Sequence, residues 1–153
     1  MMHIEWMREA LVEAKLAALA GEVPVGAVVV SGDGIIARAH NEREQLCDPT
    51  AHAEVLAIRR AAQALGRRRL HGCTLYVTLE PCPMCAGTIA LSGLDAVYFG
   101  AYDPRMGCMG SVYSLTEDPA IAANIPAVGG LMEEECLQSV QRFFEAQREE
   151  IKR

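Results

Sequence analysis

Positive charge is scarce in this 153-residue sequence, as are aromatic side chains, which make up 5% of the chain. Fourteen basic residues face 20 acidic ones, so the formal net charge is −6. An acidic total argues against a protein that holds nucleic acid by neutralising many phosphates over a broad surface. A local basic patch, such as the three arginines at 67–69, is still compatible with nucleic-acid binding.

Long uninterrupted apolar runs are also missing. The apolar N-terminal stretch is broken at helical spacing by charged residues, including Glu5, Arg8 and Glu9. Such a stretch is neither a secretory signal peptide nor a membrane span, so we expect a cytoplasmic protein with no membrane segment. In that compartment the six cysteines stay reduced, and a close cysteine pair is more typical of metal binding or catalysis than of a disulfide.

The composition is otherwise that of an ordinary folded protein. Hydrophobic residues make up 51% of the chain and charged residues 22%, which argues against disorder. A chain of this length buries about 68–70% of the surface that it exposes when unfolded, enough for one self-sufficient core. No repeat or linker divides the sequence, so we predict a single domain over residues 1–153.

Hydrophobic periodicity alternates between helices and strands along the chain. The spacing of apolar residues predicts helices over 4–20, 51–65, 81–92 and 131–152, and strands over 23–30, 35–39, 74–79, 96–102 and, more weakly, 124–128. The glycine-rich turn at 31–34 makes the first two strands an antiparallel hairpin. The order predicts an α/β protein, a three-layer α/β/α sandwich around a central mixed sheet of about five strands with parallel crossovers in its second half.

The stretch LEPCPMCAG at 79–87 contains two cysteines, Cys82 and Cys85. Because they are three residues apart at a predicted helix start, both sulfurs project from one side of the first turn and can share a metal. The helix dipole at that end favours the thiolate form, which metals bind. A redox dithiol has the same pattern, and a structural zinc knot would need a second close pair, whereas the other four cysteines are solitary.

His52 differs from the other three histidines because it lies at a predicted helix start, two residues before Glu54. A pocket off the end of that helix can be reached by both side chains. With Cys82 and Cys85, His52 gives three protein ligands, the number expected of a catalytic zinc that keeps a fourth position for water. Glu54, left without a metal bond, can move the proton of that water, which predicts hydrolytic attack on an electrophilic carbon.

HAE at 52–54 followed by PCPMC at 81–85 resembles the H-x-E…P-C-x-x-C signature of zinc-dependent nucleobase deaminases. Further stretches extend the likeness over most of the chain: EVPVGAVVV at 22–30, DPTAHAE at 48–54, TLYVTLEPCPMCAG at 74–87 and FGA at 99–101. Within that superfamily these stretches resemble the bacterial tRNA-specific adenosine deaminases.

The resemblance implies a cytidine deaminase-like fold and conversion of the wobble adenosine of a tRNA anticodon to inosine, with release of ammonia. It also implies one zinc per subunit and a homodimer with its active site near the interface. Because an anticodon loop already splays its bases and offers few phosphates, it suits a protein whose total charge is acidic.

The resemblance also assigns roles residue by residue. His52, Cys82 and Cys85 would bind zinc, and Glu54 would shuttle the proton. The N–H of Ala53 and the carbonyl of Pro81 would hold the purine and its departing amine; Val25 and Asn41 would line the base pocket; and the loop around Asp103 would meet flanking nucleotides. This loop departs from the family pattern of small residues and a lysine, because it carries Arg105, Met106, Cys108 and Met109.

Two other readings of the zinc site remain. One is a small-molecule deaminase of guanine, cytosine or cytidine with the same ligands. The other is a catalytically silent, zinc-stabilised RNA-binding domain, which would need no free carboxylate beside the histidine. Separately, the helix within 84–94 is apolar or small on nearly every side, so it is either deeply buried or part of a subunit interface.

Overall fold

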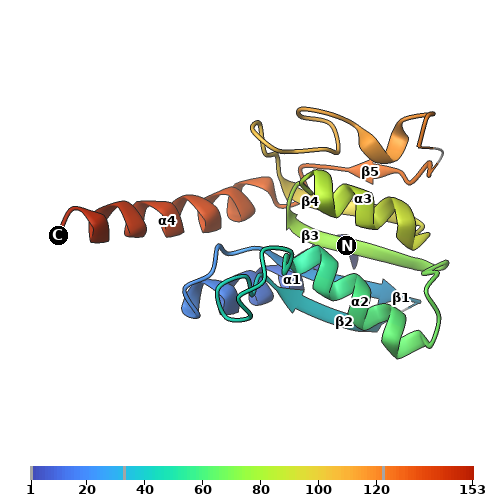
Figure 1. Cartoon of the computed structure of the whole chain (residues 1–153), viewed down its shortest axis with the longest axis horizontal. Helices are drawn as coiled ribbons and strands as arrows, with labels where there is room; N and C mark the ends of the chain where they lie inside the picture. Colours follow the sequence, from blue (N-terminus) through green and yellow to red (C-terminus); the bar gives the residue numbers. More distant parts are fainter. Residues whose placement is uncertain (1, 33, 122) are drawn as a thin grey trace.

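The computed structural model describes residues 2–32, 34–121 and 123–153 and is built on one mixed sheet with strand order β2-β1-β3-β4-β5 (Figure 1). The strands are β1 (Gly26–Ser31), β2 (Gly34–His40), β3 (Cys73–Leu79), β4 (Ala96–Ala101) and β5 (Ala127–Val128). β1 runs antiparallel to β2 and β3, whereas β3, β4 and β5 are parallel. The predicted five-stranded mixed sheet that begins with an antiparallel hairpin is confirmed; Asp33, in the predicted turn, lies outside the described residues.

Helices cover both faces of the sheet. α2 (Ala53–Leu65) and α3 (Pro83–Ser92) lie on one face, and α1 (Met2–Leu19) and the start of α4 (Glu133–Ile151) lie on the other (Figure 1). The three-layer prediction is therefore confirmed. A short 3-10 helix, η1 (Leu115–Glu117), was not predicted from the sequence.

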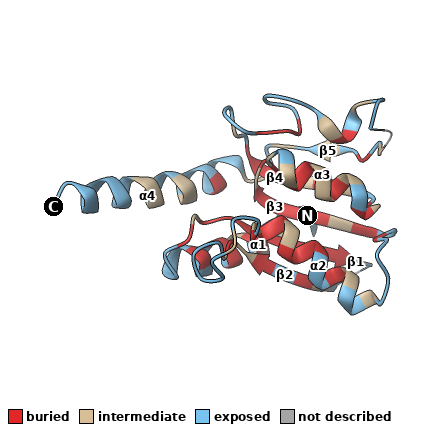
Figure 2. Ribbon diagram, viewed as in Figure 1, coloured by how far each residue is buried: buried red, intermediate tan, exposed pale blue. Residues whose placement is uncertain are grey.

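The alternation of side chains along β1 explains how both faces are buried. Ala27 and Val29 join the core under α2, while Val28 and Val30 join a smaller cluster that Trp6 of α1 covers. This is the period of two expected of a strand in the middle of a sandwich. Buried residues accordingly concentrate in the strands and the inner helix faces (Figure 2).

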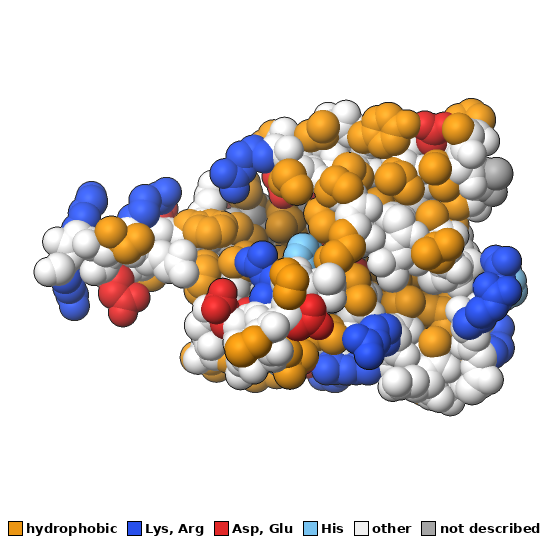
Figure 3. All heavy atoms as spheres, viewed as in Figure 1, with side chains coloured by type: hydrophobic (Ala, Val, Ile, Leu, Met, Phe, Trp, Pro, Cys, Tyr) orange, Lys and Arg blue, Asp and Glu red, His pale blue; other side chains and the backbone are white. Residues whose placement is uncertain are grey.

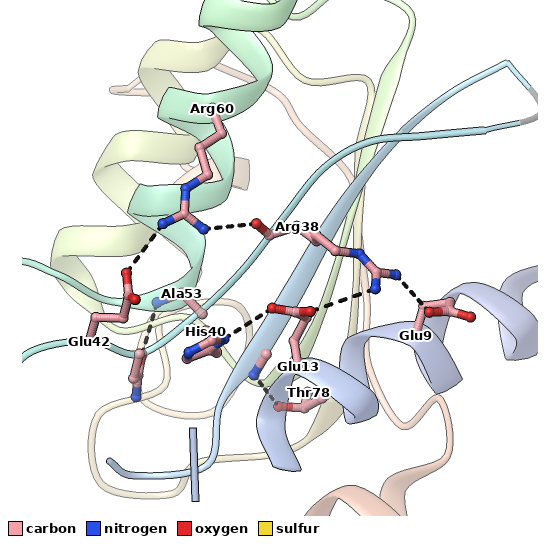
Figure 4. A network of polar contacts seen from close by, with 10 residues as sticks. Glu9, Glu13, Arg38, His40, Glu42, Ala53, Arg60 and Thr78 are labelled. Carbon is pink, nitrogen blue, oxygen red and sulfur yellow. Dashed lines mark hydrogen bonds and ion pairs between the residues drawn. The ribbon is translucent and has the colours of Figure 1, made fainter. Parts of the chain in front are cut away.

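α1 approaches the sheet closely at Gly26. A Cβ atom there would lie 2.0 Å from the carbonyl oxygen of Ala10, so only glycine fits. A polar network fixes the same helix to β2 (Figure 4). The buried Glu13 carboxylate lies 3.0 Å from His40 Nδ1 and 3.6 Å from an Arg38 nitrogen. The end of β2, and with it the start of the following loop, is thereby held against α1.

The predicted first strand is shorter than expected because residues 23–25 form a tight turn. The N–H of Val25 donates to the carbonyl of Val23 at 2.8 Å, and the Asn41 amide donates to the same carbonyl at 3.1 Å. This turn directs Val25 away from the sheet and towards the edge where α2 and α3 begin.

α4 leaves the body of the molecule after its first turns (Figure 1). Cys136 is buried against β4, whereas most of the helix beyond it is exposed (Figure 2). None of the helices in the described ranges has the length and apolarity to cross a membrane.

Candidate active site

The site lies where α2 and α3 begin. His52 immediately precedes α2 and Cys82 immediately precedes α3, both with extended backbone, and neither side chain caps its own helix. Their side chains therefore face the common space between the two helix starts. His52 Nδ1 lies 3.7 Å from Cys82 Sγ and 3.5 Å from Cys85 Sγ.

The ligand atoms of His52, Cys82 and Cys85 all lie within 4.8 Å of one another. One imidazole nitrogen and two sulfurs form a donor set that fits zinc. No fourth histidine, cysteine or carboxylate from the described part of the chain joins this group. Three protein donors suit a catalytic ion with an open position better than a closed structural site.

Glu54 is buried beside this group, and its Oε1 atom has no hydrogen-bond partner among the described residues. Burial raises the pKa of the carboxyl group, because desolvation disfavours the charged form. A buried polar atom without a partner is rare in folded proteins. Since Glu54 also lines the cavity described below, its free oxygen is available to a molecule that enters there.

The two cysteines have opposite protonation tendencies. The hydrogen bond with Cys85 lowers the pKa of Cys82 to about 4, and the contact with His52 acts in the same direction. The hydrogen bond with Cys82, together with burial, raises the pKa of Cys85. The hydrogen bond with Cys82 also raises the pKa of His52. The group thus already holds one thiolate at neutral pH, the form in which cysteine binds metals.

A cavity of about 540 Å³ is lined by two of the three candidate ligands, His52 and Cys82, while Cys85 is buried behind them. Figure 3 shows this face hollowed between α4 and the body, with hydrophobic side chains beside the hollow. Four groups of residues line the cavity. The inner part comprises Val23, Val25, Asn41, His52, Glu54, Leu79, Glu80 and Cys82; one wall comprises residues 102–106; and α4 contributes Leu137, Val140 and Phe144, with Arg43 at a further loop.

Of the five predicted substrate residues, three line the cavity and two do not. Val25, Asn41 and Asp103 line the cavity, whereas Ala53 and Pro81 are buried and do not. The N–H of Ala53 donates to Asn41 Oδ1 at 2.8 Å, in a bond that Figure 4 draws at Ala53. A base that used this N–H would have to share or replace that bond.

The Pro81 carbonyl and the Asp103 side chain are also engaged. The Pro81 oxygen accepts a hydrogen bond from the N–H of Cys108 at 2.8 Å, which leaves one lone pair for another donor. Asp103 Oδ1 accepts bonds from the N–H groups of Arg105 and Met106. The Asp103 carboxylate therefore shapes its own turn at the rim of the cavity.

Sequence reasoning missed two buried carboxylates near the cavity, Glu22 and Glu80. Each accepts hydrogen bonds from backbone N–H groups of a loop distant in sequence. It also missed that α4 lines the cavity, although the amphipathic character of that helix was visible. The position of Glu80 directly before Pro81 was the only signal available for it.

A comparison with family models matches residues 1–126 to the MafB19-like deaminase family. The tRNA-specific adenosine deaminase of Bacillus subtilis (strain 168) is 50% identical over 147 residues, 96% of this chain and 91% of that protein. The enzyme of the same name from Aquifex aeolicus (strain VF5) is 48% identical over 116 residues, 76% of this chain and 77% of that protein.

Two solved structures bear on the site. One, from a study of A-to-I editing by tRNA:A34 deaminases at the wobble position of transfer RNA, has a TM-score of 0.85 and 43% identity and covers 88% of this chain and 98% of that one. A guanine deaminase from Bacillus subtilis has a TM-score of 0.62 and 42% identity, and covers 64% of this chain and 63% of that one.

Proposed function

Because this chain belongs to the tRNA-specific adenosine deaminases, within the MafB19-like deaminase family, we propose that it deaminates adenosine to inosine at the wobble position of a tRNA anticodon. The observation that carries the proposal is the free Oε1 of Glu54 beside His52, Cys82 and Cys85 at the inner end of an open cavity. A hydrolytic site needs such a carboxylate, and a structural metal site does not.

His52, Cys82 and Cys85 would hold one zinc ion per chain. Their chemistry supports this assignment, because two soft sulfurs and one imidazole nitrogen are typical zinc donors. When bound, zinc lowers the pKa of a water molecule towards neutrality and so supplies a nucleophile. One thiolate is already present at neutral pH, since the pKa of Cys82 is about 4.

Glu54 moves the proton in this mechanism. Its carboxylate takes a proton from the attacking water, whose oxygen bonds to C6 of the adenine ring. The carboxyl then donates the proton to the exocyclic amine as the C6–N bond breaks, so that inosine and ammonia form. The raised pKa of Glu54 makes its carboxylate a stronger base for the first step.

The inner cavity would hold the base. Its volume of about 540 Å³ lies within the range usual for small-ligand sites. Val25 provides apolar contact and Asn41 polar contact, while the N–H of Ala53 and the free lone pair of the Pro81 carbonyl are expected to meet the ring and the departing amine. The loop at Asp103 would contact the nucleotides that flank the target.

An RNA substrate is compatible with the acidic total charge. Arg43 and Arg105 both line the cavity, so positive charge is present at the mouth even though the chain as a whole carries −6. An anticodon loop presents few phosphates, and a few local cations are enough to contact them.

We further propose one cytoplasmic deaminase domain over residues 1–153 that acts as a homodimer. α3 buries Cys85, Ala86 and Ile89, whereas Leu91 on the same helix is 79% exposed. Of the two alternatives for this helix, the exposed Leu91 supports an interface. If the protein at micromolar concentration has the solution mass of one chain and not of two, the dimer is refuted.

The second candidate is a small-molecule nucleobase deaminase with the same site, which the likeness to a guanine deaminase supports. One assay separates the two functions. The zinc-loaded protein is incubated with an anticodon stem-loop that carries a wobble adenosine, and separately with free guanine, cytosine and cytidine. Inosine in the stem-loop alone supports the tRNA activity, whereas deamination of the free compounds alone transfers the assignment to the second candidate.

A further inference from the structure

Glu80 is a buried carboxylate, 2% exposed, that neither the zinc ligands nor the proton shuttle uses. It accepts four hydrogen bonds, all from one segment later in the chain. Oε1 accepts from the N–H of Asp103 at 3.0 Å and from the Ser111 hydroxyl at 2.5 Å. Oε2 accepts from the N–H groups of Met109 and Ser111, each at 3.0 Å.

The segment 103–111 wraps closely around this carboxylate. A Cβ atom at Gly107 would lie 2.3 Å from the Glu80 carboxyl carbon, so the backbone passes directly over the group. The neighbouring N–H of Cys108 donates to the Pro81 carbonyl at 2.8 Å. Glu80 and Pro81 therefore bind the segment at both of its ends and near its middle. Both residues immediately precede the proposed zinc ligand Cys82.

The segment contains no regular secondary structure, although the side chains of Cys108 and Met109 are buried and backbone hydrogen bonds close turns within it. Apart from turns within itself and one isolated bridge from Met109 to Ser114, its described residues belong to no strand or helix. Buried backbone N–H groups need acceptors, and here one side chain supplies three of them. Because Asp103, Pro104, Arg105 and Met106 form a wall of the cavity, Glu80 determines where that wall stands relative to the zinc ligands.

We propose that Glu80 is a positioning residue for the RNA: it holds the 103–111 segment as the wall against which nucleotides flanking the target bind. This role rests on the proposed tRNA activity for its substrate, but the anchoring itself does not. The residue would act on substrate binding and leave the proton transfer at Glu54 unaffected.

Glutamine cannot replace this carboxylate. In either orientation of the glutamine amide, its NH₂ group faces at least one backbone N–H group. In the more favourable orientation, the NH₂ group lies next to Ser111 Oγ, and the N–H of Asp103 then has no acceptor. One orphaned buried donor weakens the bound arrangement by about tenfold or more. For Glu80→Gln we therefore expect a rise of about tenfold in KM for the stem-loop, with kcat and zinc content close to wild type.

Hydrogen exchange provides a readout independent of activity. The amides of Asp103, Met109 and Ser111 should exchange faster in zinc-loaded Glu80→Gln than in wild type, while amides of α2 should be unchanged. Glu5→Gln, at an exposed carboxylate in the first turn of α1, is the matched control and should alter neither KM nor exchange in the 103–111 segment.

Gly107→Ala tests the same displacement without removing the carboxylate. The added methyl group would collide with Glu80, so the segment must move, and KM should again rise with kcat retained. This variant decides the question if Glu80→Gln fails to fold or to hold zinc. A folded, zinc-loaded variant whose KM and amide exchange both match wild type would overturn the proposal, as would a fall in kcat at unchanged KM.

Failure of the proposed function gives a different result. If the wild-type protein makes no inosine from the stem-loop, the tRNA assignment falls, whereas exchange at the three amides still tests the anchor. If wild type is active and the variants bind the stem-loop normally, the positioning role of Glu80 falls and the tRNA assignment stands.

Discussion

Glu54 illustrates how a functional residue costs stability. Its Oε1 atom is buried without a partner, which is unfavourable in the resting protein but leaves the oxygen free for a water molecule or a leaving amine. His52 immediately precedes α2 and Glu54 lies in its first turn, and both side chains line one pocket.

At the residue scale, Glu54→Ala should lower the rate of inosine formation by about 10²–10⁴-fold, because it removes the group that moves the proton. Zinc content, measured by elemental analysis, should stay near one ion per chain, since Glu54 does not belong to the ligand group. The melting temperature should not fall to the extent expected for loss of a well-bonded buried side chain. Loss of zinc together with activity would show that Glu54 is a ligand.

Cys82 should be the reactive thiol of the zinc-free protein. Its pKa is lowered to about 4, so the thiolate predominates at neutral pH, and the rate of alkylation should stay constant on acidification until the pH approaches about 4. Mass spectrometry of peptides labelled with iodoacetamide measures this rate. Saturating zinc should protect the residue, and a rate at Cys82 that falls steadily from neutral pH downward would contradict the prediction.

At the scale of elements, local patterns predicted the helices and strands because the two periodicities are distinct. The active group was also predictable, since HAE and PCPMC each lie at a helix start that the local sequence predicts. The role of Glu80 could not be predicted, because its hydrogen-bond partners lie 23–31 residues later in the chain. No local sequence pattern pairs a carboxylate with N–H groups at that distance. The bond between Asn41 and Ala53 escaped for the same reason.

The contact between α1 and β1 gives a prediction at this scale. Gly26→Ala should lower the free energy of unfolding by about 1–3 kcal/mol, because the methyl group would overlap the Ala10 carbonyl and α1 must shift. Gly34→Ala is the matched control, since nothing lies within 4 Å of a Cβ atom there and the residue has no positive φ. Chemical denaturation of both variants measures the difference, and equal stabilities would show that α1 does not pack as described.

At the scale of the whole molecule, charge and apolar surface are distributed in ways that the totals conceal. The chain carries −6, yet two arginines line the cavity. Exposed apolar side chains include Leu91 on α3 and Val112 and Tyr113 between β4 and η1, and Figure 3 shows hydrophobic side chains spread over this face. An apolar surface of this kind is typical of a protein contact.

Leu91→Glu therefore tests the proposed homodimer. Leu91 is 79% exposed in the single chain, so a charge there costs little in a monomer, but it would be desolvated against a second copy of α3. We expect wild type to have twice the chain mass of 16.6 kDa by light scattering, and the variant to shift towards 16.6 kDa at micromolar concentration. The melting temperature of the dissociated chain should change little if the core is intact.

Leu19→Glu is the matched control for this experiment. Leu19 is 78% exposed, almost the same as Leu91, but it ends α1 on the opposite face of the sheet. A dimer that contacts through α3 should tolerate this change, so the control should keep the wild-type mass. If both variants dissociate, the effect is one of added charge alone; if only Leu19→Glu dissociates, the interface lies on the α1 face; and if neither does, α3 is not at the centre of the contact.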